Sequence, residues 1–288
     1  MVMRLYFSLS ICSEILEIQK YSFKLLILKP NLFMQLMDAT KIEALVAEFR
    51  LRSKGMIDFG KYSYYAITHH STSIEGSTLT ESQVVNLLEY GKPATNKPFD
   101  HHLMVVDHFH ALQFVVEEAE KKRELSPGFI QEMNALVMKN TGGVVNTVLG
   151  NYNIAAGEFR LGTVRAGTRT FPDYKKVPEM VAQLCREVNE KFKVVQTFEE
   201  KSNLAFHVHF QLVSIHPFGD GNGRTSRLLM NYIQAFFGLP LSIVFQQDRI
   251  RYINALEASR TKAIEKPFYD FMYSQYSKFL KKEIAQLK

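Results

Sequence analysis

Residues 216–227 read His216-Pro217-Phe218-Gly219-Asp220-Gly221-Asn222-Gly223-Arg224-Thr225-Ser226-Arg227 and join two stretches that we expect to be helical. The histidine can take up a proton near neutral pH, and the aspartate can hold a hard cation such as Mg²⁺ through oxygen. Three glycines in five residues let the backbone curl, so successive N–H groups can point at one anion. The apolar run Leu228-Leu229-Met230 follows directly, so the loop ends at a helix N-terminus, which favours negative charge.

Arg224 and Arg227 are three residues apart and therefore share one face of the expected helix. Two guanidinium groups in a first turn work against the helix dipole unless an anion lies there. A plain surface turn is the alternative interpretation of the glycines, but it does not account for the two arginines. We therefore interpret the stretch as a site for a di- or triphosphate. His216 would lie at its rim and activate a nucleophile for attack on phosphorus.

The same twelve residues resemble the Fic family signature, H-x-F-x-[DE]-G-N-G-R-x-x-R, with every fixed position present. Most Fic proteins are AMP transferases, which move AMP from ATP to a Tyr, Thr or Ser hydroxyl of a protein. The resemblance implies a mostly α fold, a helical bundle with a β-hairpin flap over the active site. It also implies an enzyme, a protein adenylyltransferase that uses ATP as substrate and Mg²⁺ as cofactor.

The resemblance implies a role for each position of the signature. His216 would be the catalytic base that deprotonates the target hydroxyl, and Phe218 would anchor the loop in the core. Asp220 would hold Mg²⁺ between the α- and β-phosphates. Arg224 would bind the α- and β-phosphates and Arg227 the γ-phosphate. The signature positions expected to bind the nucleotide are Asp220, Gly221, Asn222, Gly223, Arg224, Thr225, Ser226 and Arg227.

A second motif, Ser71 to Gly76, lies at the end of another expected helix. Gly76 is a natural stop for that helix, which places Glu75 where the dipole opposes a carboxylate by roughly 0.3–1 kcal/mol. An acid in that position indicates a cationic partner. The alternative is a capping box, formed by Thr72 and Glu75, that opens a short helix.

The Fic resemblance favours the first interpretation, because Ser71-x-x-x-Glu75-Gly76 resembles the family's inhibitory motif, [ST]-x-x-x-E-[GN]. In that motif the glutamate pairs with the second signature arginine, here Arg227. It occupies the place of the γ-phosphate, and ATP then binds in a non-productive pose. The resemblance thus implies a self-inhibited enzyme whose inhibitory residues are Ser71, Glu75 and Gly76.

Two other functions remain open at this stage. In some Fic proteins the same glutamate positions a water that removes AMP from a modified target, so deAMPylation through Glu75 is an alternative activity. A non-catalytic module that senses nucleotide or binds a toxin partner is an alternative of a different class. The intact His216 and Asp220 argue against such a module, because a pure binding protein needs neither.

Residues 141–172 are rich in glycine and β-prone residues. The pattern predicts a hairpin between Phe159–Thr163 and Arg169–Phe171 across the turn 165–168. An ordinary surface hairpin is one interpretation. The Fic family places its flap here, and the flap edge would hold the target segment by strand addition.

The resemblance also implies nucleotide contacts from this turn and from a later helix. The residues concerned are Ala166, Gly167, Thr168, Arg169 and Tyr252. The family's Asn near the end of that later helix is replaced by Arg260 or a neighbour, which leaves the base selectivity open.

The remaining stretches read mainly as helices. Helical spacing and capping signals predict helices that begin near residues 38–40, 62, 80, 99, 126, 177, 197, 224, 249 and 267. Four histidines, which we interpret as packing and surface residues rather than metal ligands, fall on one of them: His101, His102, His108 and His110.

Composition narrows the setting of the protein. The net charge of +6 over 288 residues is mild, and no long Lys/Arg run occurs, so nucleic acid is not indicated. The two cysteines match no metal spacing and favour a reducing compartment, so we expect a cytoplasmic protein. The expected partner is a protein target docked on the flap, while self-modification and a homodimer are left open.

Residues 1–37 differ in character from the rest, being apolar and aromatic with scattered charge. Their longest apolar run is too short to span a bilayer, so no membrane association is expected. We interpret them as an atypical N-terminal extension from a mis-assigned start, with the native start at Met34 or Met37. Residues 38–288 would then form one Fic domain with flanking helices.

Overall fold

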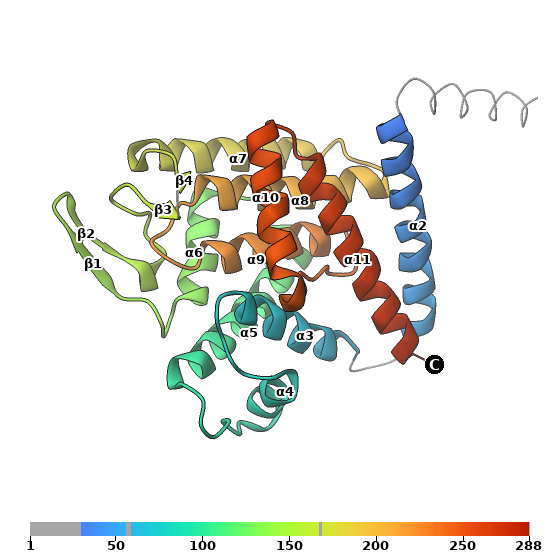
Figure 1. Cartoon of the computed structure of the whole chain (residues 1–288), viewed down its shortest axis with the longest axis horizontal. Helices are drawn as coiled ribbons and strands as arrows, with labels where there is room; N and C mark the ends of the chain where they lie inside the picture. The colour runs from blue at the N-terminus through green and yellow to red at the C-terminus, as the bar shows by residue number, and fades with distance from the viewer. Residues whose placement is uncertain (1–29, 56–58, 167–168, 288) are drawn as a thin grey trace, which may run out of the picture.

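The computed structural model describes residues 30–55, 59–166 and 169–287, and most of these residues are helical (Figure 1). The mostly α prediction is therefore confirmed. The α-helices of the described residues are α2 (Pro30–Ser53), α3 (Phe59–Ile74), α4 (Glu81–Tyr90), α5 (Phe99–Glu120), α6 (Pro127–Val137), α7 (Val177–Phe192), α8 (Phe198–Ile215), α9 (Asn222–Phe236), α10 (Arg249–Lys262) and α11 (Lys266–Gln286).

Helix α9 lies in the middle of the bundle and packs against α8, α5 and α6. It is buried along almost its whole length, including its polar first turn. Leu228, Leu229 and Ile233 are completely buried, and the burial of each such side chain contributes about 1.5–3 kcal/mol to stability. The helix that carries the end of the signature is thus fixed by the core on several sides.

Capping follows the sequence-based predictions at several helix ends. Thr80 and Gln83 form a capping box at the start of α4, and Gly91 ends that helix with a φ of 63°. Thr197 and Glu200 form the capping box of α8. These caps satisfy backbone N–H groups that would otherwise lack partners.

Helix α2 begins earlier than predicted. The sequence interpretation placed its start at Asp38 or Thr40, whereas α2 starts at Pro30 and runs through residue 38 without a break. Proline suits the first turn of a helix, and the residues that follow it include good helix formers such as leucine, methionine and glutamine. Residues 1–29 lie outside the described residues.

The predicted hairpin is wrong in its first strand. Strand β3 (Arg165–Ala166) pairs with β4 (Arg169–Thr170) in antiparallel register. Phe159, placed in that strand by the sequence pattern, instead forms a bridge with Phe218. The signature loop supplies an extended backbone at this point, so the β-prone segment pairs with it and not with β4. Gly167 and Thr168 of the predicted turn lie outside the described residues.

We refer to the hairpin formed by β3 and β4 as the flap. A second hairpin, which was not predicted, precedes it in the chain. Strand β1 (Val144–Thr147) pairs with β2 (Gly150–Asn153), and the pair projects from the bundle at the left of Figure 1. Among the described residues, no helix is both long and apolar enough to cross a membrane.

Candidate active site

The signature loop is closed by its own asparagine. The Oδ1 of Asn222 accepts a hydrogen bond from the Phe218 N–H at 3.0 Å, and its Nδ2 donates to the Phe218 carbonyl at 2.9 Å. Phe218 is fully buried, as the family resemblance implied. Gly221 has a φ of +78°, and a Cβ there would lie 2.7 Å from Nδ2 of Asn134. These hydrogen bonds and the lack of space at Gly221 restrict the conformation of the curl between α8 and α9.

Asn134 on α6 holds the loop through hydrogen bonds, a role that the sequence did not reveal. Its Nδ2 donates to the Asp220 carbonyl at 3.1 Å and to the Thr225 hydroxyl at 3.0 Å. The Ser226 hydroxyl donates to the Asn222 carbonyl at 2.7 Å. Thr225 and Ser226 are fully buried, and both hydroxyls are engaged within the protein.

Two buried guanidinium groups lie at the start of α9. Arg224 and Arg227 are only 2% and 3% exposed. Within the described part of the chain, Nε and Nη1 of Arg224 and Nη1 of Arg227 have no hydrogen-bond partner. Buried donors without partners are costly, and these three belong to cations beside a helix N-terminus. The arrangement is suited to an anion.

Glu75 reaches Arg227 from the end of α3. Its Oε1 lies 2.7 Å from Nη2 of Arg227, while the Ser71 hydroxyl and carbonyl each accept from Arg227 at 2.9 Å. Gly76 has a φ of +107°, which ends the helix as predicted. The alternative capping box is absent, because Thr72 lies within α3 and its hydroxyl donates to the Thr68 carbonyl at 2.8 Å.

The carboxylate of Glu75 is ionised and lies over the first turn of α9. Burial favours its neutral form, but Arg227, Arg224 and Arg249 outweigh burial and lower its pKa. The Glu75 side chain is 33% exposed to solvent, because it borders a cavity. Its carboxylate nevertheless lies close to other protein atoms. A Cβ on Gly223 would lie 2.3 Å from its Oε1. Glu75 thus holds a negative charge where a bound phosphate would be stabilised by the helix N-terminus.

His216 follows the last residue of α8 in a left-handed conformation, with a φ of 55°. Burial is the main cause that lowers its pKa, to about 4, and Arg160, Arg169 and Arg260 lower it further, against the carbonyl of Val213. The imidazole is therefore neutral at pH 7 and able to accept a proton.

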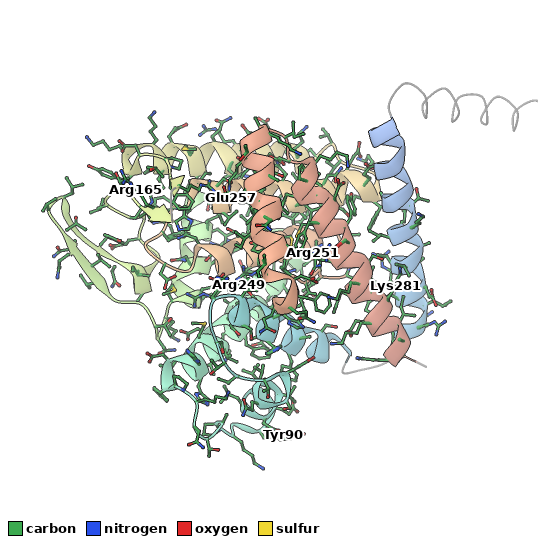
Figure 2. The ribbon with its side chains drawn as sticks, in the orientation of Figure 1. Tyr90, Arg165, Arg249, Arg251, Glu257 and Lys281 are labelled. Carbon is green, nitrogen blue, oxygen red and sulfur yellow. The ribbon has the colours of Figure 1, made fainter. Side chains whose placement is uncertain are left out.

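A cavity of about 510 Å³ is lined by Glu75, His216 and Arg227, whereas Asp220 and Arg224 are not among its lining residues. Residues along α10 line it too, among them Arg249 and Glu257, which are labelled in Figure 2. Arg169 and Tyr252, for which the resemblance implies nucleotide contacts, also line this cavity. The lining residues are Ile74, Glu75, Arg169, Phe171, Val213, His216, Gly223, Arg227, Arg249, Tyr252, Ile253, Leu256, Glu257 and Arg260.

On the flap side, Arg169 and Phe171 line this cavity. The lining residues of α10 are Arg249, Tyr252, Ile253, Leu256, Glu257 and Arg260. Tyr252 is buried and its hydroxyl lies 3.0 Å from Nε2 of His209. Arg169 lies 3.3 Å from Glu257. Ala166 is paired with Arg169 through the backbone.

Three arginines that the sequence interpretation did not assign to the site hold its framework. Arg249 donates from Nε to the Ile74 carbonyl at 2.8 Å, which fixes the end of α3. Arg160 is 1% exposed and donates to three backbone carbonyls, including that of His216 at 2.8 Å. Arg260, noted only as a departure from the family, pairs with Glu257 at 2.7 Å.

Asp220 is the carboxylate available to a metal ion. Its side chain is 64% exposed and lies 3.5 Å from Nη2 of Arg224. Among the described residues, no cluster of three or more His, Cys, Asp or Glu side chains is arranged to hold a metal. A single carboxylate beside a site suited to an anion could hold Mg²⁺, which commonly takes its remaining ligands from phosphates and water.

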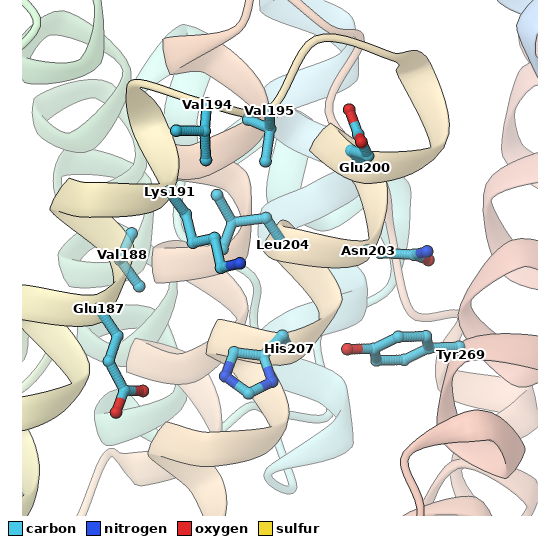
Figure 3. A pocket seen from close by; sticks show the side chains of 10 residues that line it. All are labelled: Glu187, Val188, Lys191, Val194, Val195, Glu200, Asn203, Leu204, His207 and Tyr269. Atoms are coloured by element: carbon cyan, nitrogen blue, oxygen red, sulfur yellow. The ribbon is translucent and has the colours of Figure 1, made fainter.

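A second cavity of about 440 Å³ lies away from the signature, between α7, α8 and α11 (Figure 3). Figure 3 shows the Tyr269 hydroxyl pointing toward His207. His207 pairs with Glu265 at 2.8 Å. This cavity contains no residue of the signature or of the inhibitory motif, so we assign the candidate active site to the first cavity.

The chain is similar in sequence to known proteins. The sequence model of the Fic/DOC family matches residues 124–234, which include α6, the flap and the signature. "Protein adenylyltransferase Fic" from Drosophila persimilis is 31% identical over 212 residues, covering 74% of this chain and 39% of that protein. The chain thus spans about two fifths of the length of the curated relatives it matches.

Solved structures show the same fold. A fragment of Fic-1 from C. elegans has a TM-score of 0.72 and 25% identity, covering 88% of this chain and 73% of that one. A Fic domain containing signaling protein from Bacteroides thetaiotaomicron has a TM-score of 0.72 and 23% identity, covering 85% and 96%. Residues 124–234 of the chain therefore match a Fic/DOC domain, and the described residues have the fold of the solved Fic structures. The predicted Fic fold is confirmed.

Proposed function

We propose that this protein is an adenylyltransferase that moves AMP from ATP to a Tyr, Thr or Ser hydroxyl of a protein. The observation that carries the proposal is a cavity lined both by the neutral imidazole of His216 and by the buried Arg227 at a helix N-terminus, whose Nη1 has no hydrogen-bond partner among the described residues. A base and an anion site in one cavity are what nucleotidyl transfer requires. The printed name of the Drosophila relatives supports the same activity.

In the proposed reaction, His216 takes the proton of the target hydroxyl while the hydroxyl oxygen attacks the α-phosphorus of ATP. The bond from the α-phosphorus to the bridging oxygen breaks, and pyrophosphate leaves. The amides of the loop and Arg224 hold the phosphate oxygens as charge develops. General base catalysis of this kind contributes typically about 10²–10⁴-fold to the rate.

We assign the Mg²⁺ position to Asp220, with phosphate oxygens and water as the other ligands. A bound Mg²⁺ would neutralise part of the polyphosphate charge. The rest of the proposed nucleotide site consists of Gly221, Asn222, Gly223, Arg224, Thr225, Ser226, Arg227, Arg169 and Tyr252. For Thr225 and Ser226 the contribution is structural, because their hydroxyls are engaged inside the protein.

We further propose that Glu75 inhibits the enzyme. Its carboxylate pairs with Nη2 of Arg227 and lies against Gly223. A terminal phosphate that paired with Arg227 would compete with this carboxylate, and two anions at one position repel each other. Ser71 accepts two hydrogen bonds from the same guanidinium and so keeps it aligned with Glu75.

Removal of AMP from a modified protein is the second candidate function. It is favoured by the ionised carboxylate of Glu75 in the same cavity as His216, because such a carboxylate can orient a water molecule. For either reaction, we propose that the target segment adds as a strand to the flap β3–β4.

The test uses ATP labelled at the α- or the γ-phosphate, supplied with Mg²⁺ to Glu75→Gly and to Glu75→Gly/His216→Ala. The proposal predicts protein-bound label from the α-phosphate alone, lost in the double variant. Label from the γ-phosphate alone would indicate a kinase and overturn the proposal. Label retained in the double variant would remove His216 as the base.

The labelled Glu75→Gly protein then distinguishes the second candidate. Unlabelled wild type and unlabelled Glu75→Gly are added to it separately. Loss of label with wild type alone would assign AMP removal to Glu75. Equal retention in both mixtures would exclude removal from this substrate.

A further inference from the structure

Directly after the second strand of the flap, the aromatic ring of Phe171 lies flat against the imidazole of His216. Phe171 follows β4, and its ring stacks on the imidazole with centroids 3.9 Å apart and an interplanar angle of 17°. Phe171 is 7% exposed. One face of the imidazole is therefore covered by a side chain that belongs to the flap.

A single buried side chain joins the backbones on both sides of this stack. Arg160 donates from Nε to the His216 carbonyl at 2.8 Å and from Nη2 to the Pro172 carbonyl at 2.6 Å. The Phe171 N–H donates to the Val164 carbonyl at 3.1 Å. The relative position of the two rings is thus set by hydrogen bonds as well as by their contact.

The charges around His216 come from three elements. Arg160 precedes β3, Arg169 lies on β4, and Arg260 lies on α10. Glu257 on α10 accepts from Arg169 and Arg260 and offsets part of their charge. Arg169 also lies over the ring of Phe171, at 4.5 Å from its centroid. Burial is nevertheless the largest influence on the imidazole.

We propose that Phe171 is a positioning residue for His216. The ring of Phe171 fixes the plane of the imidazole and excludes water from one of its faces. The flap then has a role apart from holding a target, because its position sets the orientation and protonation of the base. The kinetic consequence rests on the proposed function, whereas the effect on His216 itself does not.

The direct test is the titration of His216 by NMR in the full chain. The protein has nine histidines, and the His216 signal is the one that His216→Ala removes. In wild type we expect no titration of His216 between pH 5 and 8, because burial holds its pKa at about 4. In Phe171→Ala, water reaches the ring, and we expect the midpoint to rise by about one pH unit or more, toward 6.5.

Three further variants make this test specific. Phe171→Tyr keeps the flat face and should titrate as wild type does. Phe171→Leu keeps apolar volume without a flat face and should give a smaller upward shift, which keeps the test open if Phe171→Ala folds poorly. Phe192→Ala removes a stack of similar geometry, 3.9 Å and 9° against Phe236, and should leave His216 unchanged.

The kinetic arm measures α-phosphate transfer against pH in a Glu75→Gly background. We expect the acid limb of kcat to move upward in Phe171→Ala by the amount seen by NMR, with the KM for ATP unchanged, and Phe171→Tyr to restore it. A folded Phe171→Ala whose His216 still does not titrate above pH 5 would overturn the positioning role. Absence of transfer in every variant would overturn the proposed function alone, since the NMR titration decides the inference independently.

Discussion

The signature loop and the flap meet at His216, but they are held in different ways. The loop is tied by both polar atoms of the Asn222 side chain, by Asn134 and by a buried helix start. The flap strands share two residue pairs. An isolated two-stranded hairpin is marginally stable in water, so the flap depends on contacts with the rest of the protein, among them those of Arg160 and Phe171 and the pair of Arg169 with Glu257.

This difference separates two tasks of the site. The loop must present amides and guanidinium groups in one fixed arrangement, since preorganisation is what makes electrostatic stabilisation effective. The flap borders the cavity and must admit a target segment under the proposed function. A rigid anion site and a lightly tied cover are therefore complementary. Substitutions in the two regions should differ in their cost.

The largest expected loss of stability comes from Gly221→Ala. Alanine at this position would have to keep a backbone φ of +78°, and its Cβ would lie 2.7 Å from Nδ2 of Asn134. We therefore expect a loss of about 2–4 kcal/mol in the free energy of unfolding. Gly91→Ala is the matched control, because its φ is +63° with nothing within 4 Å. It should cost about 1 kcal/mol. Urea unfolding of the two variants measures both, and equal losses would contradict a tightly packed loop.

The next effect is a pH dependence that belongs to His216. Its pKa is about 4 in the folded protein against an ordinary value of 6.5, so the unfolded state binds more protons between these values. Stability therefore falls as the pH decreases through this window. From pH 7 to 5, wild type should lose about 2 kcal/mol more than His216→Ala. Urea unfolding at both pH values tests this, and parallel losses would mean that the imidazole is not desolvated.

The smallest effect is expected in the flap. Arg165 on β3 is exposed, as Figure 2 shows. Arg165→Ala should change the free energy of unfolding by less than about 0.5 kcal/mol. A loss above about 1 kcal/mol in thermal or urea unfolding would show that the flap is tied more firmly than its two residue pairs indicate.

The sequence predicted the parts of the site that depend on neighbouring residues. The order of His216, the glycines and Arg227 follows from one short stretch, and Glu75 was assigned to Arg227 through a motif at a helix end. The mostly α fold and several caps followed from local patterns. Although Glu75 and Arg227 lie far apart in the sequence, their pairing could be predicted because each of them belongs to a motif.

The residues that the sequence did not reveal act through backbone carbonyls far along the chain. Asn134 reaches the Asp220 carbonyl across 86 residues, and Arg249 reaches the Ile74 carbonyl across 175. Such contacts leave no local pattern, because any carbonyl in the right place serves. The first flap strand was misplaced for a similar reason, since the partner of Phe159 is the signature loop itself.

We propose that the ion pair between Glu75 and Arg227 restrains a site that is otherwise complete. The most direct measurement is the initial rate of α-phosphate transfer to the protein by wild type and Glu75→Gly at the same ATP and Mg²⁺ concentrations. Thr72→Ala is a control, because it alters the same helix end without touching Arg227. We predict a rate at least about tenfold higher in Glu75→Gly, as expected when about 1.4 kcal/mol of competing interaction is removed, and no increase in Thr72→Ala. Equal rates in wild type and Glu75→Gly would contradict the account.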